Sequence, residues 1–384
     1  MSRLSSLPRT LRIDLSGAPA AFLWGPRKVG KSTLLQAQFP DARRYDLLDT
    51  ELKTGLLLRP RLLREEVLAE RPKLVVIDEV QKVPALLDEV HWLVENTRTK
   101  FVLCGSSARK LRNESSNLLG GRAWRYELFP LTSKEIPNFD LVRAVNHGTI
   151  PAHYLSDAPE RSLRAYVLDY LEQEIRAEAL TRNVPAFAAF LDAVAASHGM
   201  LLNYANVARE CGVAPKTVRE YYQILEDTLL GHTLPPWRKA KNRRLIETAK
   251  FYLFDPGVVR ALRGLSRIEP GTVEFGGAFE HVLIEEVRAY NAYSERHAPL
   301  TYWRTSTGFE VDLVVGALEL AIEFKSSAHV REDAARGLRA LAGEHRVRKS
   351  IVVSMDARAR ELEGGVLVLP WREFLERLWA GELF

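Results

Sequence analysis

Residues 19–32 read PAAFLWGPRKVGKS, and this stretch decides the expected fold of the N-terminal part of the chain. The apolar run 19–24 is typical of a buried strand, and it leads directly into the pattern G-x-x-x-x-G-K-S. Gly25 and Gly30 allow a tight loop whose amide groups surround a phosphate, and a helix starting near Lys31 adds the positive end of its dipole. This order predicts a P-loop that binds ATP. A glycine-rich turn with an unrelated lysine is the alternative.

The residues of this loop are expected to hold ATP and Mg²⁺ together. Lys31 reaches the β- and γ-phosphates in such a loop, and the Ser32 hydroxyl binds Mg²⁺. The predicted ATP-binding residues are Gly25, Pro26, Arg27, Lys28, Val29, Gly30, Lys31, Ser32 and Thr33.

Two further apolar strands end in polar residues. The first, 74–77, is followed by Asp78, which we expect to hold Mg²⁺, and by Glu79, which we expect to activate the attacking water. Two acids that only cap the next helix are the alternative. The second strand, 101–104, ends in Gly-Ser-Ser, so Ser106 is a candidate to sense the γ-phosphate, and a simple turn is the alternative.

An arginine is a further candidate catalytic residue. Arg122 follows the sequence LLGG and is expected to neutralise transition-state charge in a neighbouring subunit. A solvated surface arginine is equally consistent with the sequence. The rival arginines are Arg109, Arg112 and Arg125.

The spacing of the apolar stretches predicts the fold of this part of the chain. Helical segments separate them, which favours a parallel sheet with helices on both faces and with ATP at the carboxyl edge. Cys104 is expected to be a small buried hydrophobe. The expected strands lie near 20–24, 43–47, 73–77, 101–104 and 126–129.

A helical middle follows, and we expect residues 138–180 to form a small lid. Helices near 187–196 and 202–210, the latter with Asn203 as N-cap, precede a turn and a helix at 215–225. This pattern favours a helix-turn-helix, and the start of its second helix would meet DNA. A protein-contact module is the alternative. The predicted DNA contacts here are Lys216, Thr217 and Arg219.

A basic segment comes next and is expected to form the wing of a winged helix. It carries five cations and no acid between Trp237 and Arg244, and cations beside a tryptophan suit phosphate contact and base stacking. A solvated charged loop is the alternative. The predicted DNA contacts in it are Arg238, Lys239, Lys241, Arg243 and Arg244.

Carboxylates gather near the C-terminus. A hairpin of strands 309–315 and 318–326 would bring Asp312, Glu323 and Lys325 together, because alternate residues share one face of a strand. Glu280 joins them from a helix near 274–290, whose Glu286 is expected to face outward. Such acids suit Mg²⁺ or Mn²⁺, and with Lys325 as a catalytic residue the metal would activate water against a phosphodiester. A salt-bridged strand pair, or a nuclease fold that has lost activity, is the alternative.

These motifs together resemble a bacterial and archaeal family of AAA-type ATPases, over essentially the full length. The matching stretches are GPRKVGKSTLL, LVVIDEVQKVP, the GSS after the fourth strand, LLGGR followed by ELFPLT, FYLFDPG, GGAFE, YWRTSTGFEVD and AIEFKSS. The resemblance implies an ATPase core, a winged helix and a domain similar to PD-(D/E)XK nucleases, with Asp312, Glu323 and Lys325 as the D…E-x-K triad. Ser32, where a threonine is common, and Cys104 are the main departures.

Length and composition limit the class of protein and the number of domains. The chain has 384 residues, 46% hydrophobic residues and a net charge of +5, which indicates an ordinary soluble protein of two or three domains at about 150 residues each. No apolar stretch approaches the length of a membrane span, no secretory signal is visible, and two distant cysteines predict no disulfide, so we expect a cytoplasmic protein without a membrane partner.

We therefore predict an α/β protein divided into a P-loop ATPase core (1–137), a helical lid (138–180), a winged-helix domain (181–262) and a nuclease-like domain (263–384). The expected function is ATP hydrolysis coupled to duplex or branched DNA, in a homo-oligomer that can be a hexameric ring. A regulatory ATPase switch that binds protein partners is the alternative. A small-molecule kinase fits less well, because Glu79 suits water activation.

Overall fold

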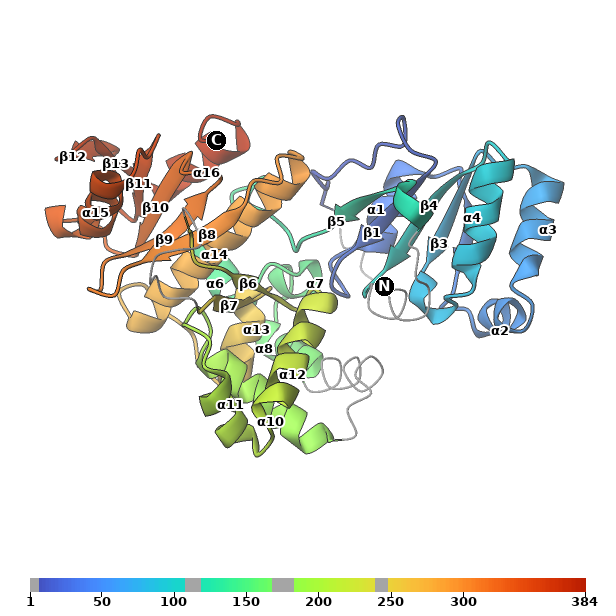
Figure 1. Ribbon diagram of the computed structural model, residues 1–384, viewed down its shortest axis with the longest axis horizontal. Helices are drawn as coiled ribbons and strands as arrows, with labels where there is room; N and C mark the ends of the chain where they lie inside the picture. Colours follow the sequence, from blue (N-terminus) through green and yellow to red (C-terminus); the bar gives the residue numbers. More distant parts are fainter. Residues whose placement is uncertain (1–6, 108–118, 168–182, 239–247) are drawn as a thin grey trace. The chain divides into compact units, whose positions relative to one another are not determined.

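The computed structural model describes residues 7–107, 119–167, 183–238 and 248–384 of the chain, shown as the coloured ribbon in Figure 1. They form two compact units. The first contains the described residues up to Leu131 and residues 223–230, and the second contains the remaining described residues. Several predicted residues lie outside the described ranges: Arg109, Arg112, Lys239, Lys241, Arg243, Arg244 and the last part of the predicted lid.

A five-stranded parallel sheet forms the centre of the first unit, as the sequence predicts. Its strand order is β2-β3-β4-β1-β5, so β1 lies between β4 and β5. The strands are β1 (Ala20–Trp24), β2 (Arg43–Asp46), β3 (Leu74–Asp78), β4 (Lys100–Gly105) and β5 (Ala123–Glu127).

The fifth strand differs from its prediction at 126–129. It begins at Ala123 and ends at Glu127, in register with the whole of β1. The strand β5 lies at the edge of the sheet, and its residues Trp124 and Arg125 are exposed. It therefore lacks the continuous apolar run from which the prediction identified buried strands.

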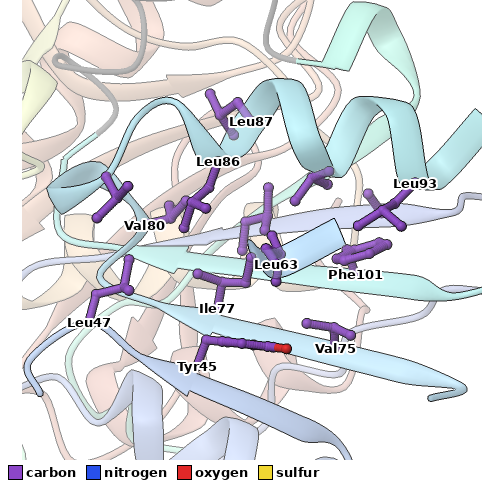
Figure 2. Packing of buried hydrophobic residues seen from close by; sticks show 14 of the residues in the cluster. Tyr45, Leu47, Leu63, Val75, Ile77, Val80, Leu86, Leu87, Leu93 and Phe101 are labelled. Atoms are coloured by element: carbon purple, nitrogen blue, oxygen red, sulfur yellow. The ribbon is translucent and has the colours of Figure 1, made fainter. Parts of the chain in front are cut away.

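Successive apolar residues along the strands point to opposite faces of this sheet, and both faces are buried. Val75 and Ile77 of β3 join a core that also contains Leu86 and Leu93, and Figure 2 shows these leucines above the sheet. Val76 is equally buried but belongs to the opposite face. The helices of this unit are α1 (Lys31–Gln38), α2 (Thr50–Leu58), α3 (Arg61–Glu70) and α4 (Leu86–Asn96), with short 3₁₀ turns η1 (Val80–Lys82) and η2 (Leu119–Gly121).

The second unit begins with helices, and two of them lie near the ranges 202–210 and 215–225 that the sequence predicts. Asn203 is the N-cap of α11, since its side chain accepts a hydrogen bond from Asn206 N at 3.0 Å, and the left-handed Gly212 ends that helix. The helices are α6 (Leu141–His147), α7 (Pro151–Tyr154), α8 (Pro159–Ala165), α10 (Val184–Ala196), α11 (Tyr204–Cys211), α12 (Pro215–Asp227, within this unit up to Tyr222) and α13 (Pro256–Leu262).

Aromatic rings join these helices to a two-stranded antiparallel sheet of β6 (Gly231–Leu234) and β7 (Lys250–Leu253). The Tyr222 ring lies 4.9 Å from that of Phe190 and 4.8 Å from that of Phe251. This packing fixes β7 against the helices.

The rest of the second unit is a six-stranded mixed sheet with the long helix α14 (Val273–Tyr293). The predicted hairpin is present, because β9 and β10 pair antiparallel, with Leu313 opposite Ile322. The sheet order is β12-β13-β11-β10-β9-β8. Its elements are β8 (Leu300–Arg304), β9 (Glu310–Val315), β10 (Leu320–Lys325), η4 (Glu332–Ala335), α15 (Arg336–Glu344), β11 (Ser350–Ser354), β12 (Arg360–Leu362), β13 (Val366–Pro370) and α16 (Trp371–Trp379).

Glu286 corrects one expectation for α14. It does not face outward, since only 4% of it is exposed and its carboxylate accepts hydrogen bonds from Ser133 and from Trp379. These partners lie far away in sequence, so the helical pattern alone could not reveal them. In the described ranges, every helix is too short or too polar to span a bilayer.

Candidate functional site

The P-loop between β1 and α1 has the backbone conformation that the glycine pattern predicts. Lys28 and Gly30 both have positive φ, at 62° and 96°. Lys31 is buried, and its ammonium donates to Gly25 O at 2.7 Å and to Pro26 O at 3.0 Å. The lysine is thus folded back over its own loop, where it contacts two backbone carbonyl groups. Pro26 and Val29 are buried, whereas Ser32 and Thr33 are exposed at the start of α1.

The two predicted Mg²⁺ ligands meet across the site. Ser32 Oγ donates to Asp78 Oδ2 at 2.5 Å, although 46 residues separate them. Asp78 is the last residue of β3, so the parallel sheet brings its carboxylate to the same edge as the P-loop. A hydroxyl and a carboxylate are oxygen ligands of the kind that Mg²⁺ prefers, so this pair fits the ion.

Glu79 and Ser106 come together through a residue that the sequence analysis did not select. Gln81 Nε2 donates to Glu79 Oε2 at 2.6 Å and to Ser106 Oγ at 3.1 Å. Glu79 has a left-handed backbone with φ of 57°, which turns the chain out of β3 and into η1. The only sequence signal for Gln81 is its position two residues after Glu79 in the stretch IDEVQ.

Arg9 is a second residue that the sequence analysis missed. Its guanidinium donates to Val29 O at 2.5 Å and to Phe129 O at 2.6 Å, so it ties the P-loop to the chain after β5. The contact with Phe129 spans 120 residues, and no local pattern predicts it.

The predicted arginine and cysteine have distinct surroundings. Arg122 is exposed and forms an ion pair with Glu95 at 2.9 Å, and its rival Arg125 is exposed as well. Cys104 is fully buried inside β4, as expected for a small hydrophobe, and burial raises the pKa of its thiol.

A second group of predicted residues meets at the β9–β10 hairpin. Asp312 Oδ2 accepts from Phe324 N at 2.8 Å, and Lys325 Nζ donates to Glu323 Oε1 at 2.6 Å. Glu323 Oε2 is buried and has no hydrogen-bond partner among the described residues. Burial raises the pKa values of both Asp312 and Glu323, and the charge of Asp312 raises that of Glu323 further. Carboxylate oxygens are ligands of the type that a divalent cation prefers, so Asp312 and Glu323 stay candidates for holding one.

Glu280 also has partners outside the predicted group, although burial and the charge of Asp312 raise its pKa. Tyr252 Oη donates to Glu280 Oε1 at 2.6 Å, and Lys250 Nζ lies 3.9 Å from the same oxygen. Lys250 also pairs with Glu310 at 2.6 Å. Lys250 and Tyr252 both come from β7, so that strand supplies a cation and a hydroxyl to this carboxylate group. Across the described ranges, no three His, Cys, Asp or Glu side chains are placed to hold a metal ion.

Of the predicted DNA contacts, four are described. Lys216 and Arg219 are exposed at the start of α12, with Thr217 half-buried between them, and the Arg219 guanidinium lies 5.1 Å from the centre of the Tyr204 ring. Arg238 lines a cavity of about 1000 Å³ in the second unit. Other members of its lining are Trp237, Arg296 and Arg346.

Three family models match successive parts of the chain. Residues 18–137 match an AAA domain, residues 138–269 match a domain of unknown function (DUF8612), and residues 275–374 match another (DUF4143). Uncharacterized proteins of Mycobacterium bovis and Mycobacterium tuberculosis are each 28% identical over 314 residues, which is 79% of this chain and 69% of theirs. An uncharacterized protein of Haemophilus influenzae is 23% identical, over 52% of this chain and 55% of its own.

Two solved structures are similar at low identity. A Walker-type ATPase of Pyrococcus abyssi is 15% identical, with a TM-score of 0.44 over 65% of this chain and 92% of its own. A signal transduction ATPase with numerous domains, which carries a tetratricopeptide repeat sensor and comes from Pyrococcus horikoshii, is 13% identical, with a TM-score of 0.23 over 76% of this chain and 49% of its own.

At these TM-scores, the fold assignment depends on the chain's own sheet and on the AAA match. The parallel sheet, the P-loop conformation and the meeting of Ser32 with Asp78 agree with that match. Residues 18–137 are therefore an AAA-type P-loop ATPase core.

Proposed function

We propose that this protein hydrolyses Mg²⁺-bound ATP at the P-loop and couples the hydrolysis to DNA. The observation that carries the ATPase part is the contact of Ser32 Oγ with Asp78 Oδ2 at 2.5 Å. It joins the two expected Mg²⁺ ligands at the edge of the sheet where Lys31 and Glu79 also lie.

Each residue of the site has a chemical role in this proposal. Lys31 binds the β- and γ-phosphates, and Ser32 and Asp78 hold Mg²⁺, which neutralises charge on the phosphates when it is bound. Glu79 accepts a proton from the attacking water, and its buried carboxylate is held ready for this by one amide. Ser106 contacts the γ-phosphate or orients the water.

The proposal includes a homo-oligomer, for which a hexameric ring is one arrangement. Arg122 is the candidate that reaches a neighbouring site, and its present partner Glu95 lies in an exposed ion pair. Exposed pairs contribute only about 1 kcal/mol or less, so Arg122 can exchange this partner for a phosphate at little cost. Arg125 is exposed too and remains its rival.

Cationic surfaces of the second unit support the DNA part. The cavity beside Trp237 is lined by three arginines, Arg238, Arg296 and Arg346, and by one acid, Glu319. Arginines bind phosphate, and a tryptophan at their side offers a face on which a base can stack. Lys216 and Arg219 at the start of α12 add two exposed cations.

At the carboxylate hairpin we propose a metal-dependent phosphodiesterase site. Asp312 and Glu323 would hold Mg²⁺ or Mn²⁺, which supplies charge for activating water, and Lys325 would contact the scissile phosphate. The support is the buried Glu323 oxygen that has no partner among the described residues. Glu280 would act from the edge of this site, through its contacts with Tyr252 and Lys250.

A regulatory ATPase is the second candidate, and the same β7 contacts favour it. If Lys250 and Tyr252 hold Glu280 permanently, the cluster of Glu280, Asp312 and Glu323 has a structural role and binds no metal. In this candidate function the second unit binds protein partners instead of cleaving DNA. This candidate predicts ATP hydrolysis that is indifferent to DNA.

One experiment separates the candidates: phosphate release from ATP, measured with no DNA, linear duplex DNA and four-way DNA. We expect hydrolysis that DNA stimulates. Glu79→Gln should retain ATP binding but lose about 100-fold or more in kcat, because it removes the general base. Replacing Arg238, Arg296 and Arg346 by alanine should abolish the stimulation, whereas Arg267→Ala, at an exposed arginine paired with Glu269, should retain it.

The outcomes distinguish the two parts of the proposal. A wild-type protein that releases no phosphate contradicts the ATPase assignment. A hydrolysis rate that is the same with every DNA form contradicts the DNA part and favours the regulatory candidate.

A further inference from the structure

Gln81 connects two residues of the ATPase site that come from neighbouring strands. Its side-chain amide donates to Glu79 at the end of β3 and to Ser106 at the end of β4. All three residues are at most 8% exposed. We propose that Gln81 is a positioning residue for ATP hydrolysis, which transmits the position of Ser106 to the carboxylate of Glu79. This inference rests on the proposed ATPase function.

The chemistry of the contact fixes the orientation of the amide. If the amide were flipped, its oxygen would face Glu79 Oε2 at the 2.6 Å now occupied by Nε2, and two acceptors would meet. The amide nitrogen therefore faces the carboxylate. In this orientation the same NH₂ group has a second hydrogen for Ser106, so one group serves both contacts.

The amide oxygen shows that this arrangement is maintained at a cost. Gln81 Oε1 is buried and has no hydrogen-bond partner among the described residues. An unsatisfied buried acceptor destabilises a protein by about 1–3 kcal/mol. A methionine or leucine at this position would avoid that penalty, so the amide is better explained by its contacts with Glu79 and Ser106 than by stability.

The backbone of β4 also makes room for the amide. A Cβ added to Gly105 would lie 2.4 Å from Gln81 Oε1 and 2.8 Å from the Trp24 ring. A larger residue at this position would displace the end of the Gln81 side chain and the Trp24 ring. The glycine before Ser106 thus has a role that a simple turn does not require.

The two hydrogen bonds of Gln81 can couple the contact between Ser106 and a phosphate to the position of Glu79, the proposed general base. Because Ser106 and Glu79 share one donor group, any shift of Ser106 toward a γ-phosphate changes the hydrogen bond that Glu79 receives. A buried carboxylate depends strongly on such a donor, since a low-dielectric surrounding strengthens each hydrogen bond. Gln81 would thereby orient Glu79 when Ser106 contacts the γ-phosphate.

The test uses Gln81→Met, which keeps the length of the side chain and removes both donors. We expect kcat for ATP to fall by about 100-fold, as for a misplaced catalytic group, while the dissociation constant of a non-hydrolysable ATP analogue with Mg²⁺ stays within about twofold. A purely structural role would instead weaken binding of the analogue together with kcat.

A matched control and a second variant complete the test. Gln223→Met removes an amide that also donates to a carboxylate, Asp227 at 3.1 Å, but at an exposed position, and it should retain the wild-type kcat. Gln81→Glu keeps the shape and places a second acceptor against Glu79, so it should lose kcat as well, which covers the case of a misfolded Gln81→Met protein.

Two outcomes would overturn the inference, and they differ from each other. If the wild type hydrolyses ATP and a folded Gln81 variant keeps its kcat, Gln81 has no positioning role and the ATPase proposal stands. If the wild type does not hydrolyse ATP, the proposed function fails and the inference fails with it.

Discussion

Glu286 illustrates how a single residue acquires its properties from distant parts of the chain. Its carboxylate on α14 accepts from Ser133 N at 2.6 Å, from Ser133 Oγ at 2.8 Å and from Trp379 Nε1 at 2.7 Å. Burial raises its pKa to about 7, against the effect of these donors, and the nearby charge of Glu135 adds to the rise. The residue therefore titrates near neutral pH.

The raised pKa of Glu286 predicts a pH-dependent stability. Between its ordinary value near 4.5 and about 7, the folded protein binds the proton more tightly than the unfolded chain does, so the free energy of unfolding falls as pH rises through this window. The full shift of the Glu286 pKa corresponds to about 3 kcal/mol in the free energy of unfolding. Glu286→Gln should flatten this slope in urea unfolding between pH 4.5 and 8.

An exposed glutamate provides the control for this experiment. Glu269→Gln removes an acid whose side chain is 57% exposed, and it should leave the pH dependence of stability unchanged. Equal slopes in the wild type and in Glu286→Gln would contradict the assignment of this titration to Glu286.

At the scale of elements, β7 has two faces with different partners. Phe251 packs on Tyr222 of α12, whereas Lys250 and Tyr252 on the other face contact Glu310 and Glu280. Burial alone would lower the pKa of Lys250, but the charges of Glu280, Asp312 and Glu310 raise it, so the lysine stays charged. The strand therefore holds the helices and the carboxylate group together.

The buried ion pair of β7 predicts a large effect of one substitution. Lys250→Met leaves Glu310 with Arg304, at 3.2 Å, as its remaining cation, and removal of one partner from a buried pair costs about 3–5 kcal/mol. We expect a loss of this size in urea unfolding. The double variant Lys250→Met with Glu310→Gln should recover part of it, because it also removes one of the carboxylates that Lys250 faces.

A different result would change the role assigned to β7. If Lys250→Met unfolds at the wild-type urea concentration, the strand does not depend on this pair. If the double variant is less stable than Lys250→Met alone, Glu310 stabilises the fold through other contacts.

At the scale of the whole molecule, the chain carries two candidate chemical sites in separate compact units. The P-loop site lies in the first unit, and Asp312, Glu323 and Lys325 lie in the second. Each site is assembled from residues of its own unit. The two activities should therefore be separable by single substitutions.

Separate sites predict separate losses of activity. We expect Mg²⁺- or Mn²⁺-dependent nicking of plasmid DNA by the wild type, lost in Asp312→Asn and in Lys325→Ala, while both variants still release phosphate from ATP. Asparagine retains an acceptor for Phe324 N but removes the negative charge that a metal requires. A wild type that cleaves no DNA with either metal would leave the second unit as a binding module.

Local sequence was sufficient for many of the elements. The strand, loop and helix around residues 20–38, the cap at Asn203 and the β9–β10 hairpin all depend on backbone hydrogen bonds and periodicity within a few residues, which a single sequence displays. The edge strand β5 was placed too late, because its exposed residues break that periodicity.

The amino-acid sequence by itself determined the P-loop, the acids after β3 and the carboxylates of the hairpin, since each follows from residue types at fixed short spacing. Only the tertiary structure decided which side chains meet: Gln81 with Glu79 and Ser106, Arg9 with the P-loop, and Lys250 with Glu310. These contacts depend on how strands and helices pack against each other, and packing joins residues that no local pattern relates.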